Sequence, residues 1–180
     1  MYYSTDYVSP LGIVTLASDG RNLAGAWFEG QKYFGGAIGS QWEEKDDLPV
    51  FKMAVDWLDR YFQGQRPDIF ELPLAPIGTP FRHTVWKLLS RIPYGQVVTY
   101  GELGEKVAEE MGISSMSSQA IGGAVGHNPL SIIIPCHRVV CKDGSLGGYA
   151  GGIERKIALL QLEGVDLPAF HASDSPTLQQ

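Results

Sequence analysis

The chain has 180 residues, of which 44% are hydrophobic, and a formal net charge of −6. This size and composition are typical of a globular protein with a real core, folded as one domain or two small ones. No apolar run approaches the roughly 20 residues of a membrane span, and the N-terminus lacks the pattern of a signal peptide. We therefore expect a cytoplasmic protein without membrane contact. The acidic balance also argues against indiscriminate binding to nucleic acid.

The N-terminal region predicts a small sheet. Residues 2–28 alternate between apolar and polar as strands do, with a turn at Pro10-Leu11-Gly12 and a hairpin signal at Asp19-Gly20. A further strand is expected over 23–28. Residues 30–47 are rich in glycine and then acidic, which predicts a loop.

One helix accompanies this sheet. Apolar residues recur at helical spacing over residues 49–62, and Gly64 ends the pattern. The predicted inner face consists of Val50, Met53, Ala54, Trp57, Leu58 and Tyr61. Residues 70–74 suit a short strand.

After a linker at residues 75–80 the pattern becomes helical. Helices are predicted over residues 81–92, 100–111, 117 or 118 to 125, and 153–163. Thr79 caps the first, and Thr99 with Glu102 three residues later forms a capping box for the second. We expect residues 166–180 to form a flexible tail.

The helices predicted over 100–111 and 117–125, with Gly112 between them, fit a helix-turn-helix. Plain packing of two helices explains the same pattern. The second helix is unusually smooth because Ala120, Gly122, Gly123 and Ala124 carry almost no side chain. Such a helix either packs very closely on another element or lies in a narrow groove.

Cysteine is used sparingly. Cys136 and Cys141 are the only cysteines, which is neither a disulfide framework nor a zinc-finger spacing. A reducing compartment and no bound metal are expected. Cys136 lies in the run Ile134-Pro135-Cys136-His137-Arg138-Val139. It is either a buried structural cysteine or a nucleophile, since a neighbouring imidazole and guanidinium favour the thiolate.

Motifs on either side of this run decide between the two. They comprise Phe81-Arg82, Val85-Trp86, Ile92 to Gly95, Thr99 to Gly101, Gly126 to Pro129, Gly148 to Gly152, Lys156, Leu159-Leu160 and Glu163-Gly164. In this order and spacing the stretch 79–165 resembles the O6-alkylguanine-DNA alkyltransferases, repair proteins that carry an alkyl group away on their own cysteine.

The resemblance implies an α+β fold. A small sheet-plus-helix subdomain would span residues 1–75. A mostly helical DNA-binding and active-site domain with the helix-turn-helix would span residues 76–165, and the tail residues 166–180. Some relatives hold zinc in the N-terminal part, but this chain has no cysteine before Cys136, so no zinc is expected.

The resemblance also implies the catalytic residues. Cys136 would be the nucleophile, His137 would take its proton, and Glu163 would orient His137, as in a catalytic triad. Asn128 would shape the active-site turn. From the residues alone, Glu163 reads as a solvated residue near a helix end and Asn128 as a helix stop before proline. Because a thioether is not readily hydrolysed, each molecule would act once, without a cofactor.

Further residues would hold the flipped base or meet the DNA. The residues implied to bind the substrate base are Tyr100, Val139, Tyr149, Ala150 and Lys156. Among these, the Val139 carbonyl would meet the exocyclic amine and the Ala150 N–H would face O6. The residues implied to lie at the DNA are Thr99, Gln119, Ala120, Gly123 and Arg138. Plainer readings are a first-turn aromatic for Tyr100, a surface lysine for Lys156 and a fold-fixing role for Arg138.

One departure from the family pattern concerns Gln119. Many relatives have an arginine there, which enters the base stack in place of the flipped nucleotide. We expect this chain to bind double-stranded DNA more weakly than a relative with the arginine, with base flipping retained. We also expect binding through the minor groove and a monomeric protein. The residues do not decide whether O4-alkylthymine is also accepted.

Three rival functions fit parts of the pattern. A non-catalytic module that recognises alkylated DNA would lack the cysteine, and a gene regulator that senses alkylation would need a further DNA-binding domain. A cysteine hydrolase normally gathers its dyad from distant segments, whereas Cys136 and His137 are adjacent. A hydrolase would turn over many times, whereas an alkyltransferase stops after one equivalent.

Overall fold

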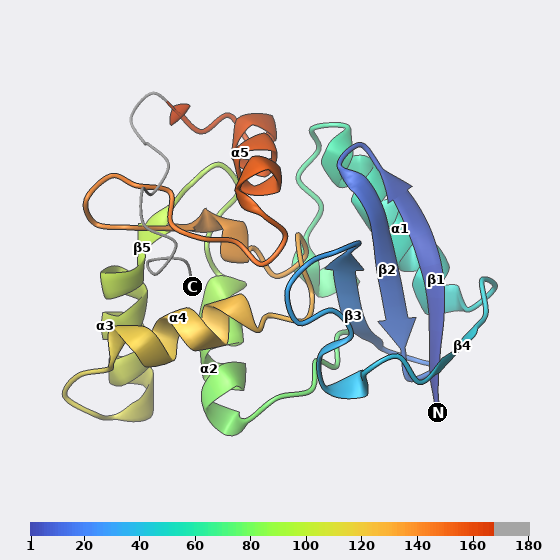
Figure 1. Ribbon diagram of the computed structural model, residues 1–180, viewed down its shortest axis with the longest axis horizontal. Coiled ribbons are helices and arrows are strands. Elements are labelled where there is room, and N and C mark those ends of the chain that lie inside the picture. Colours follow the sequence, from blue (N-terminus) through green and yellow to red (C-terminus); the bar gives the residue numbers. More distant parts are fainter. Residues whose placement is uncertain (168–180) are drawn as a thin grey trace. The chain divides into compact units, whose positions relative to one another are not determined.

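The structure is a computed structural model that describes residues 1–167. These residues form two compact units (Figure 1). The first unit contains Met1–Gly78 and the short segment Pro129–Ile133, and the second contains Thr79–Asn128 and the residues from Ile134 onward. Most of the tail predicted over 166–180 lies outside the described residues. No described helix has the length and apolarity needed to cross a bilayer.

The first unit is a four-stranded sheet with strand order β3-β2-β1-β4. Strands β1 (Tyr2–Ser9), β2 (Gly12–Ser18) and β3 (Leu23–Phe28) pair antiparallel. The hairpins predicted at Pro10 to Gly12 and at Asp19-Gly20 are confirmed. All six residues of β3 are buried, because β2 flanks one of its sides while Leu74 and Leu130 form isolated bridges to it.

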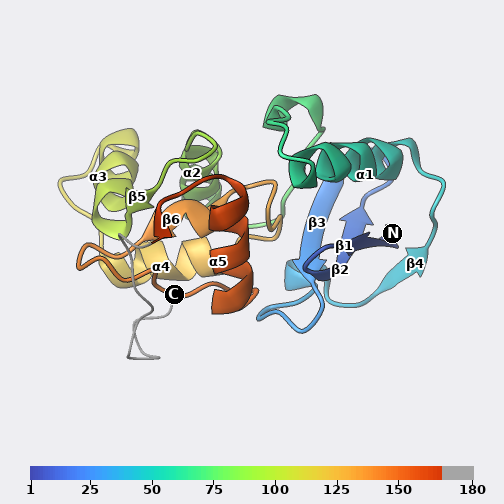
Figure 2. The ribbon, with the colours of Figure 1, turned by 90° about the horizontal axis from the view of Figure 1, so that it is seen from above.

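Helix α1 (Pro49–Phe62) covers this sheet and packs against β1, β2 and β3 (Figure 2). The helix is confirmed, and Gly64 follows it with a φ of +84°, a conformation that favours glycine. The predicted inner face is buried except for Met53, whose exposed fraction is 43%. The prediction that Met53 belongs to the inner face was therefore wrong, because this side chain lies at the edge of the buried stripe, where solvent reaches it.

Two predictions in the first unit were wrong. The predicted loop over 30–47 contains a 3-10 turn, η1 (Gly36–Ile38), and strand β4 (Trp42–Glu44), which pairs parallel with β1. A pairing partner distant in sequence determines so short a strand, so its own pattern is weak. Where a strand was expected over residues 70–74, residues 70 and 71 belong to the 3-10 turn η2 (Ile69–Glu71), which a capping box at Asp68 initiates, and Leu74 forms only an isolated bridge to Leu23.

The second unit is built from helices, as predicted. They are α2 (Pro80–Leu89), α3 (Tyr100–Met111), α4 (Ser118–Gly126) and α5 (Ile153–Leu162). The side chain of Thr79 caps α2, and Thr99 and Glu102 form the predicted capping box of α3. Helix α2 ends at Leu89, earlier than predicted, because the chain turns there before Pro93. The α+β fold class is confirmed.

Helices α2, α3 and α4 pack on one another. The Trp86 indole Nε1 donates to the Ala124 carbonyl at 2.9 Å, which ties α2 to α4. A Cβ on Gly104 of α3 would lie 3.5 Å from Ile121 of α4. Helices α3 and α4 thus pack against each other as the two helices of the predicted helix-turn-helix.

A short parallel ladder positions the site. Strand β5 (Val98–Thr99) pairs with β6 (Val139–Val140), with Val98 opposite Val139. Because β5 leads directly into α3 and β6 follows directly on the 3-10 turn η3 (Cys136–Arg138), the ladder places Tyr100 close to the cysteine turn.

Candidate active site around Cys136

The cysteine turn η3 begins after Pro135. The Cys136 N–H donates to the Ile134 carbonyl at 2.8 Å, and the Arg138 N–H donates to the Pro135 carbonyl at 3.0 Å. The side chains of Cys136, His137 and Arg138 are all buried. On a strand, the neighbouring side chains of Cys136 and His137 would point to opposite faces. In this turn both are buried.

The thiol of Cys136 is 6% exposed and lines a cavity. The other lining residues are Tyr100, Val125, Gly126, Gly148, Tyr149 and Ala150. Burial raises the pKa of the Cys136 thiol, while a hydrogen bond from Asn128 and the positive charge of Lys156 act in the opposite direction. The resting state is therefore a thiol that a base must deprotonate for attack.

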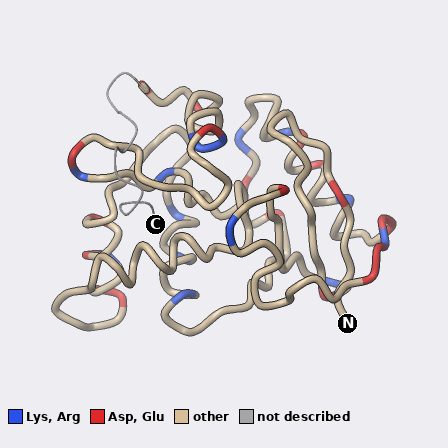
Figure 3. The backbone as a smooth tube through the Cα atoms, viewed as in Figure 1, with Lys and Arg blue, Asp and Glu red and all other residues tan. Residues whose placement is uncertain are grey.

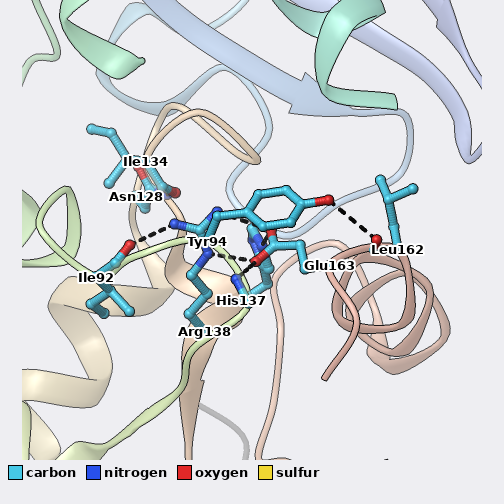
Figure 4. Close-up of polar contacts among 9 residues, drawn as sticks. Ile92, Tyr94, Asn128, Ile134, His137, Arg138, Leu162 and Glu163 are labelled. Carbon is cyan, nitrogen blue, oxygen red and sulfur yellow. Dashed lines mark hydrogen bonds and ion pairs between the residues drawn. The ribbon is translucent and has the colours of Figure 1, made fainter. Parts of the chain in front are cut away.

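Asn128 is 3% exposed, and its Nδ2 donates to the Ile134 carbonyl at 2.8 Å (Figure 4). It lies two residues after the end of α4 and holds the backbone that enters the cysteine turn. Asn128 thus joins the end of α4 to this turn, beyond the simple helix stop that the residues alone suggested.

His137 is fully buried, and its Nε2 lies 2.7 Å from Oε2 of Glu163 (Figure 4). Burial alone favours the neutral acid, but hydrogen bonds from His137 and Arg138 outweigh it, so the pKa of Glu163 lies well below its ordinary value. A carboxylate only accepts hydrogen bonds, so Nε2 carries the proton. The Nδ1 atom has no hydrogen-bonding partner among the described residues and is the basic atom of the pair.

The position of Glu163 was unexpected from its sequence context. It lies at the end of α5, where a solvated side chain is the usual outcome, yet its side chain has no exposed surface. The resemblance had assigned it to His137, and the geometry brings the two together.

Arg138 points inward and not toward the surface. Its guanidinium donates to Glu163 through Nε and Nη2 at 2.8 and 3.0 Å, and through Nη1 to the Ile92 carbonyl at 2.6 Å. The Tyr94 ring lies 5.8 Å from its Cζ atom. The expected DNA contact of Arg138 is therefore not supported, because its donors are committed to buried acceptors.

Lys156 is also buried, with no exposed surface, so the surface reading of this lysine was wrong. Its Nζ donates to three backbone carbonyls, those of Val139, Leu146 and Gly148, at 2.6, 2.5 and 3.0 Å. Burial lowers its pKa to about 8. The ammonium thus ties the loop after β6 to the cysteine turn.

Two tyrosines flank the cavity. Tyr149 stands edge-on to His137, with ring centroids 6.4 Å apart. Burial raises the pKa of Tyr100, and the sulfurs of Cys141 and Cys136 raise it further, so its hydroxyl remains protonated. Tyr149 and Ala150 are half-buried and line the cavity beside the sulfur.

The residues expected at the DNA lie elsewhere in the second unit. Gln119 is exposed near the start of α4, Ala120 is half-buried, and open space surrounds a Cβ built on Gly123. Helix α4 carries no charged side chain (Figure 3). The hydroxyl of Thr99 is occupied by its capping box at the start of α3.

Ile92, Tyr94 and Gly95 belong to one of the family motifs, but the sequence indicated no role for them. The structure shows that this segment receives Arg138 and donates the Gly95 N–H to Glu163 at 3.0 Å. The adjacent Pro93 and the φ of +78° at Gly95 are the signals of a fixed turn. Within residues 1–167, no cluster of three or more histidine, cysteine or acidic side chains could hold a metal ion.

Comparisons with known proteins agree with this geometry. Residues 80–165 match the DNA binding domain of 6-O-methylguanine DNA methyltransferase, and residues 1–76 match its ribonuclease-like domain. A methylated-DNA–protein-cysteine methyltransferase of Haemophilus influenzae is 42% identical over 89% of this chain and 86% of its own. One from Methanosarcina acetivorans is 39% identical, over 91% and 99%.

Solved structures agree as well. The Mycobacterium tuberculosis OGT crystallised in complex with DNA has a TM-score of 0.77 and 40% identity, covering 93% of this chain and 96% of its own. The O6-methylguanine methyltransferase of the same organism has a TM-score of 0.75 and 39% identity, covering 99% of both chains.

Proposed function

This chain belongs to the 6-O-methylguanine DNA methyltransferase family, and we propose that Cys136 is the residue that accepts the alkyl group. The protein repairs DNA by direct alkyl transfer, as a stoichiometric methylated-DNA–protein-cysteine methyltransferase. What remains to be assigned is the part that each side chain plays.

One observation carries the assignment. A buried thiol lies in a turn directly before a histidine whose Nε2 is bonded to a buried carboxylate at 2.7 Å. This is the order nucleophile, base and orienting group that activates cysteine and serine nucleophiles. Cys141, the other cysteine, is half-exposed and is followed by Lys142 in place of a histidine.

Alkyl transfer from guanine O6 to Cys136 forms one bond to the alkyl carbon and breaks another. The thiol proton of Cys136 passes through a water to Nδ1 of His137, and the sulfur forms a bond to the alkyl carbon. The bond from that carbon to guanine O6 breaks, and its electron pair leaves with the base. The base takes up one proton in return, so the products are unmodified guanine and a thioether. Since nothing here cleaves the thioether, the molecule acts once.

We assign base recognition to the cavity walls. The modified guanine is flipped out of the duplex, at a cost of a few kcal/mol that a badly paired lesion reduces. Tyr100, Tyr149 and Ala150 enclose it. We also assign the exocyclic amine of the base to the Val139 carbonyl, which accepts a hydrogen bond from Lys156 and has a second lone pair.

The protein binds DNA, and we assign the contact to α4 in the minor groove. Its face has small residues at Ala120 and Gly123 and an exposed Gln119, and a helix without bulky or charged side chains suits a narrow groove. Gln119 fills the space of the flipped nucleotide. From the sequence we also propose that the protein is a monomer and lies in the cytoplasm. We propose domain boundaries at residues 75/76 and 165/166.

Intact mass spectrometry tests the acceptor. The parent protein, Cys136→Ala and Cys141→Ala are each incubated with a duplex containing O6-methylguanine. One added methylene mass per molecule is expected in the parent and in Cys141→Ala, and none in Cys136→Ala. An adduct that persists in Cys136→Ala would refute the assignment. Lesion binding without any adduct would identify a recognition module.

A further inference from the structure

We propose that Arg138 is a positioning residue of the alkyl transfer, which fixes the Glu163 carboxylate so that His137 presents Nδ1 as the base. The inference rests on the proposed roles of Cys136 and His137. It assigns Arg138 a task in the reaction that differs both from a DNA contact and from general support of the fold.

The contact between Arg138 and Glu163 is a two-point contact. Nε of the guanidinium donates to one carboxylate oxygen at 2.8 Å and Nη2 donates to the other at 3.0 Å (Figure 4). The Glu163 side chain has no exposed surface and the Arg138 side chain only 10%. A planar fork on a planar carboxylate fixes both the position and the rotation of the carboxylate.

The remaining donors around Glu163 complete its coordination. Oε2 accepts from His137 as well as from Arg138, and Oε1 accepts from the Gly95 N–H as well as from Arg138. A proton on the carboxyl group would have to displace one of these four donors. Glu163 therefore acts as an acceptor, and His137 keeps its own proton on Nε2 with Nδ1 free to receive another.

Arg138 is itself held in place. Its Nη1 donates to the Ile92 carbonyl at 2.6 Å, and the Tyr94 ring lies 5.8 Å from its Cζ atom. The Tyr94 hydroxyl in turn donates to the Leu162 carbonyl at 3.2 Å, at the end of α5. The segment from Ile92 to Gly95 and the end of α5 thus hold the guanidinium from two sides.

The charges around His137 also favour a neutral imidazole. Glu163, the residue after α5, and Lys156 of α5 act on His137 electrostatically, Arg138 and Cys136 are its neighbours in the turn, and the Tyr149 ring stands edge-on to it. Burial lowers the pKa of His137, the Glu163 carboxylate opposes this, and the positive charges of Arg138 and Lys156 add to the lowering. With Arg138 absent, the unshared carboxylate would favour the imidazolium, which cannot accept the thiol proton.

Single-turnover kinetics over about pH 5.5 to 9 tests the inference on the full chain. The variants are Arg138→Lys, which keeps the charge but loses the fork, and Arg138→Met, which loses both. Arg60→Met is the matched control, since Arg60 forms a similar two-point contact with Glu71 in the first unit, on the surface. Rates are normalised to the folded fraction of each protein.

We expect Arg138→Lys to slow methyl transfer about 10- to 100-fold, because a misplaced base loses its alignment. We expect Arg138→Met also to move the midpoint of the acid limb upward by about one pH unit. Arg60→Met leaves both unchanged. The proposal is overturned if both Arg138 variants have the same normalised rate and the same midpoint as the parent. Arg138 would then have a structural role only.

Nitrogen NMR of His137 in the parent protein tests the same point where a variant fails to fold. A neutral ring protonated on Nε2 at neutral pH is expected, and an imidazolium or an Nδ1–H ring overturns the proposal. Failure of the proposed function is distinguishable, because it would show as methyl transfer by Cys136→Ala or as no transfer by the parent.

Discussion

The buried ammonium of Lys156 gives the sharpest test of the electrostatics of the site. It has no exposed surface, no acidic side chain forms an ion pair with it among residues 1–167, and its partners are three carbonyls. The substitution Lys156→Met keeps the length of the side chain and removes the charge and the donors.

The magnitude follows from linkage. Burial lowers the pKa of Lys156 to about 8, from an ordinary value of 10.5. Between these values the folded state binds fewer protons than the unfolded state, so this lysine increases stability as pH rises. At about 1.4 kcal/mol per pH unit, the full gain is about 3 kcal/mol, of which about 1.3 kcal/mol falls between pH 7 and pH 9.

Urea denaturation of the parent and Lys156→Met under reducing conditions measures this gain. Tyr7, Tyr100 and Cys136 have raised pKa values and destabilise the fold as pH rises. Both proteins share Tyr7 and Tyr100, so their effect cancels in the difference. Loss of the Lys156 charge raises the pKa of Cys136 further, which destabilises the variant more as pH rises and adds to the expected increase. The free energy of unfolding of the parent minus that of the variant should rise by about 1.3 kcal/mol from pH 7 to pH 9. Lys142→Met, which removes an exposed lysine, is measured beside it as the matched control for a Lys-to-Met change without burial.

A constant difference for Lys156→Met would refute the reasoning. It would mean that the three carbonyl dipoles stabilise the ammonium enough to cancel the desolvation caused by burial. A difference that falls with pH would mean that folding raises the proton affinity of this lysine.

Three further substitutions test the site and its support. Thr99→Ala removes the capping box of α3 and should lower the free energy of unfolding by about 1 kcal/mol, seen as a lower urea midpoint with the same slope; an unchanged midpoint would contradict the cap. Gln119→Arg adds a cation at an exposed position of α4 and should tighten binding to duplex DNA and steepen its salt dependence by up to about one unit, in titrations at several salt concentrations; an unaltered slope would place this residue away from the DNA. Gly147→Ala adds a Cβ 3.1 Å from the Cys141 sulfur and 3.2 Å from Tyr100, at a φ of +72°. It should cost about 1 to 2 kcal/mol of stability and slow methyl transfer, and a parent-like rate would show that Tyr100 need not keep its place.

Local chemistry determined much of the second unit before any contact was known. The capping box of Thr99 and Glu102 and the left-handed Gly112 begin and end α3 at the predicted residues. The apolar spacing over Pro49–Phe62 gave α1 in the same way. These elements were predictable because their hydrogen bonds and apolar stripes lie within one stretch of chain.

Short elements that depend on distant partners were not predictable. Strand β4 exists because three residues pair with β1, and nothing in its own composition requires a strand. A short strand was expected over residues 70–74, yet Phe70 lies in a 3-10 turn and is 87% exposed. In both cases the tertiary environment overrides a weak local preference.

The site divides in the same way. The sequence pointed to Cys136 and His137 through the motifs on either side of them, because the adjacent thiol and imidazole alone also fit a buried structural cysteine. Only the tertiary structure could bury Lys156 and Glu163, because a charged side chain on a helix is solvated unless partners from elsewhere in the chain satisfy it. Those partners are backbone carbonyls for the lysine, and His137 and Arg138 for the carboxylate.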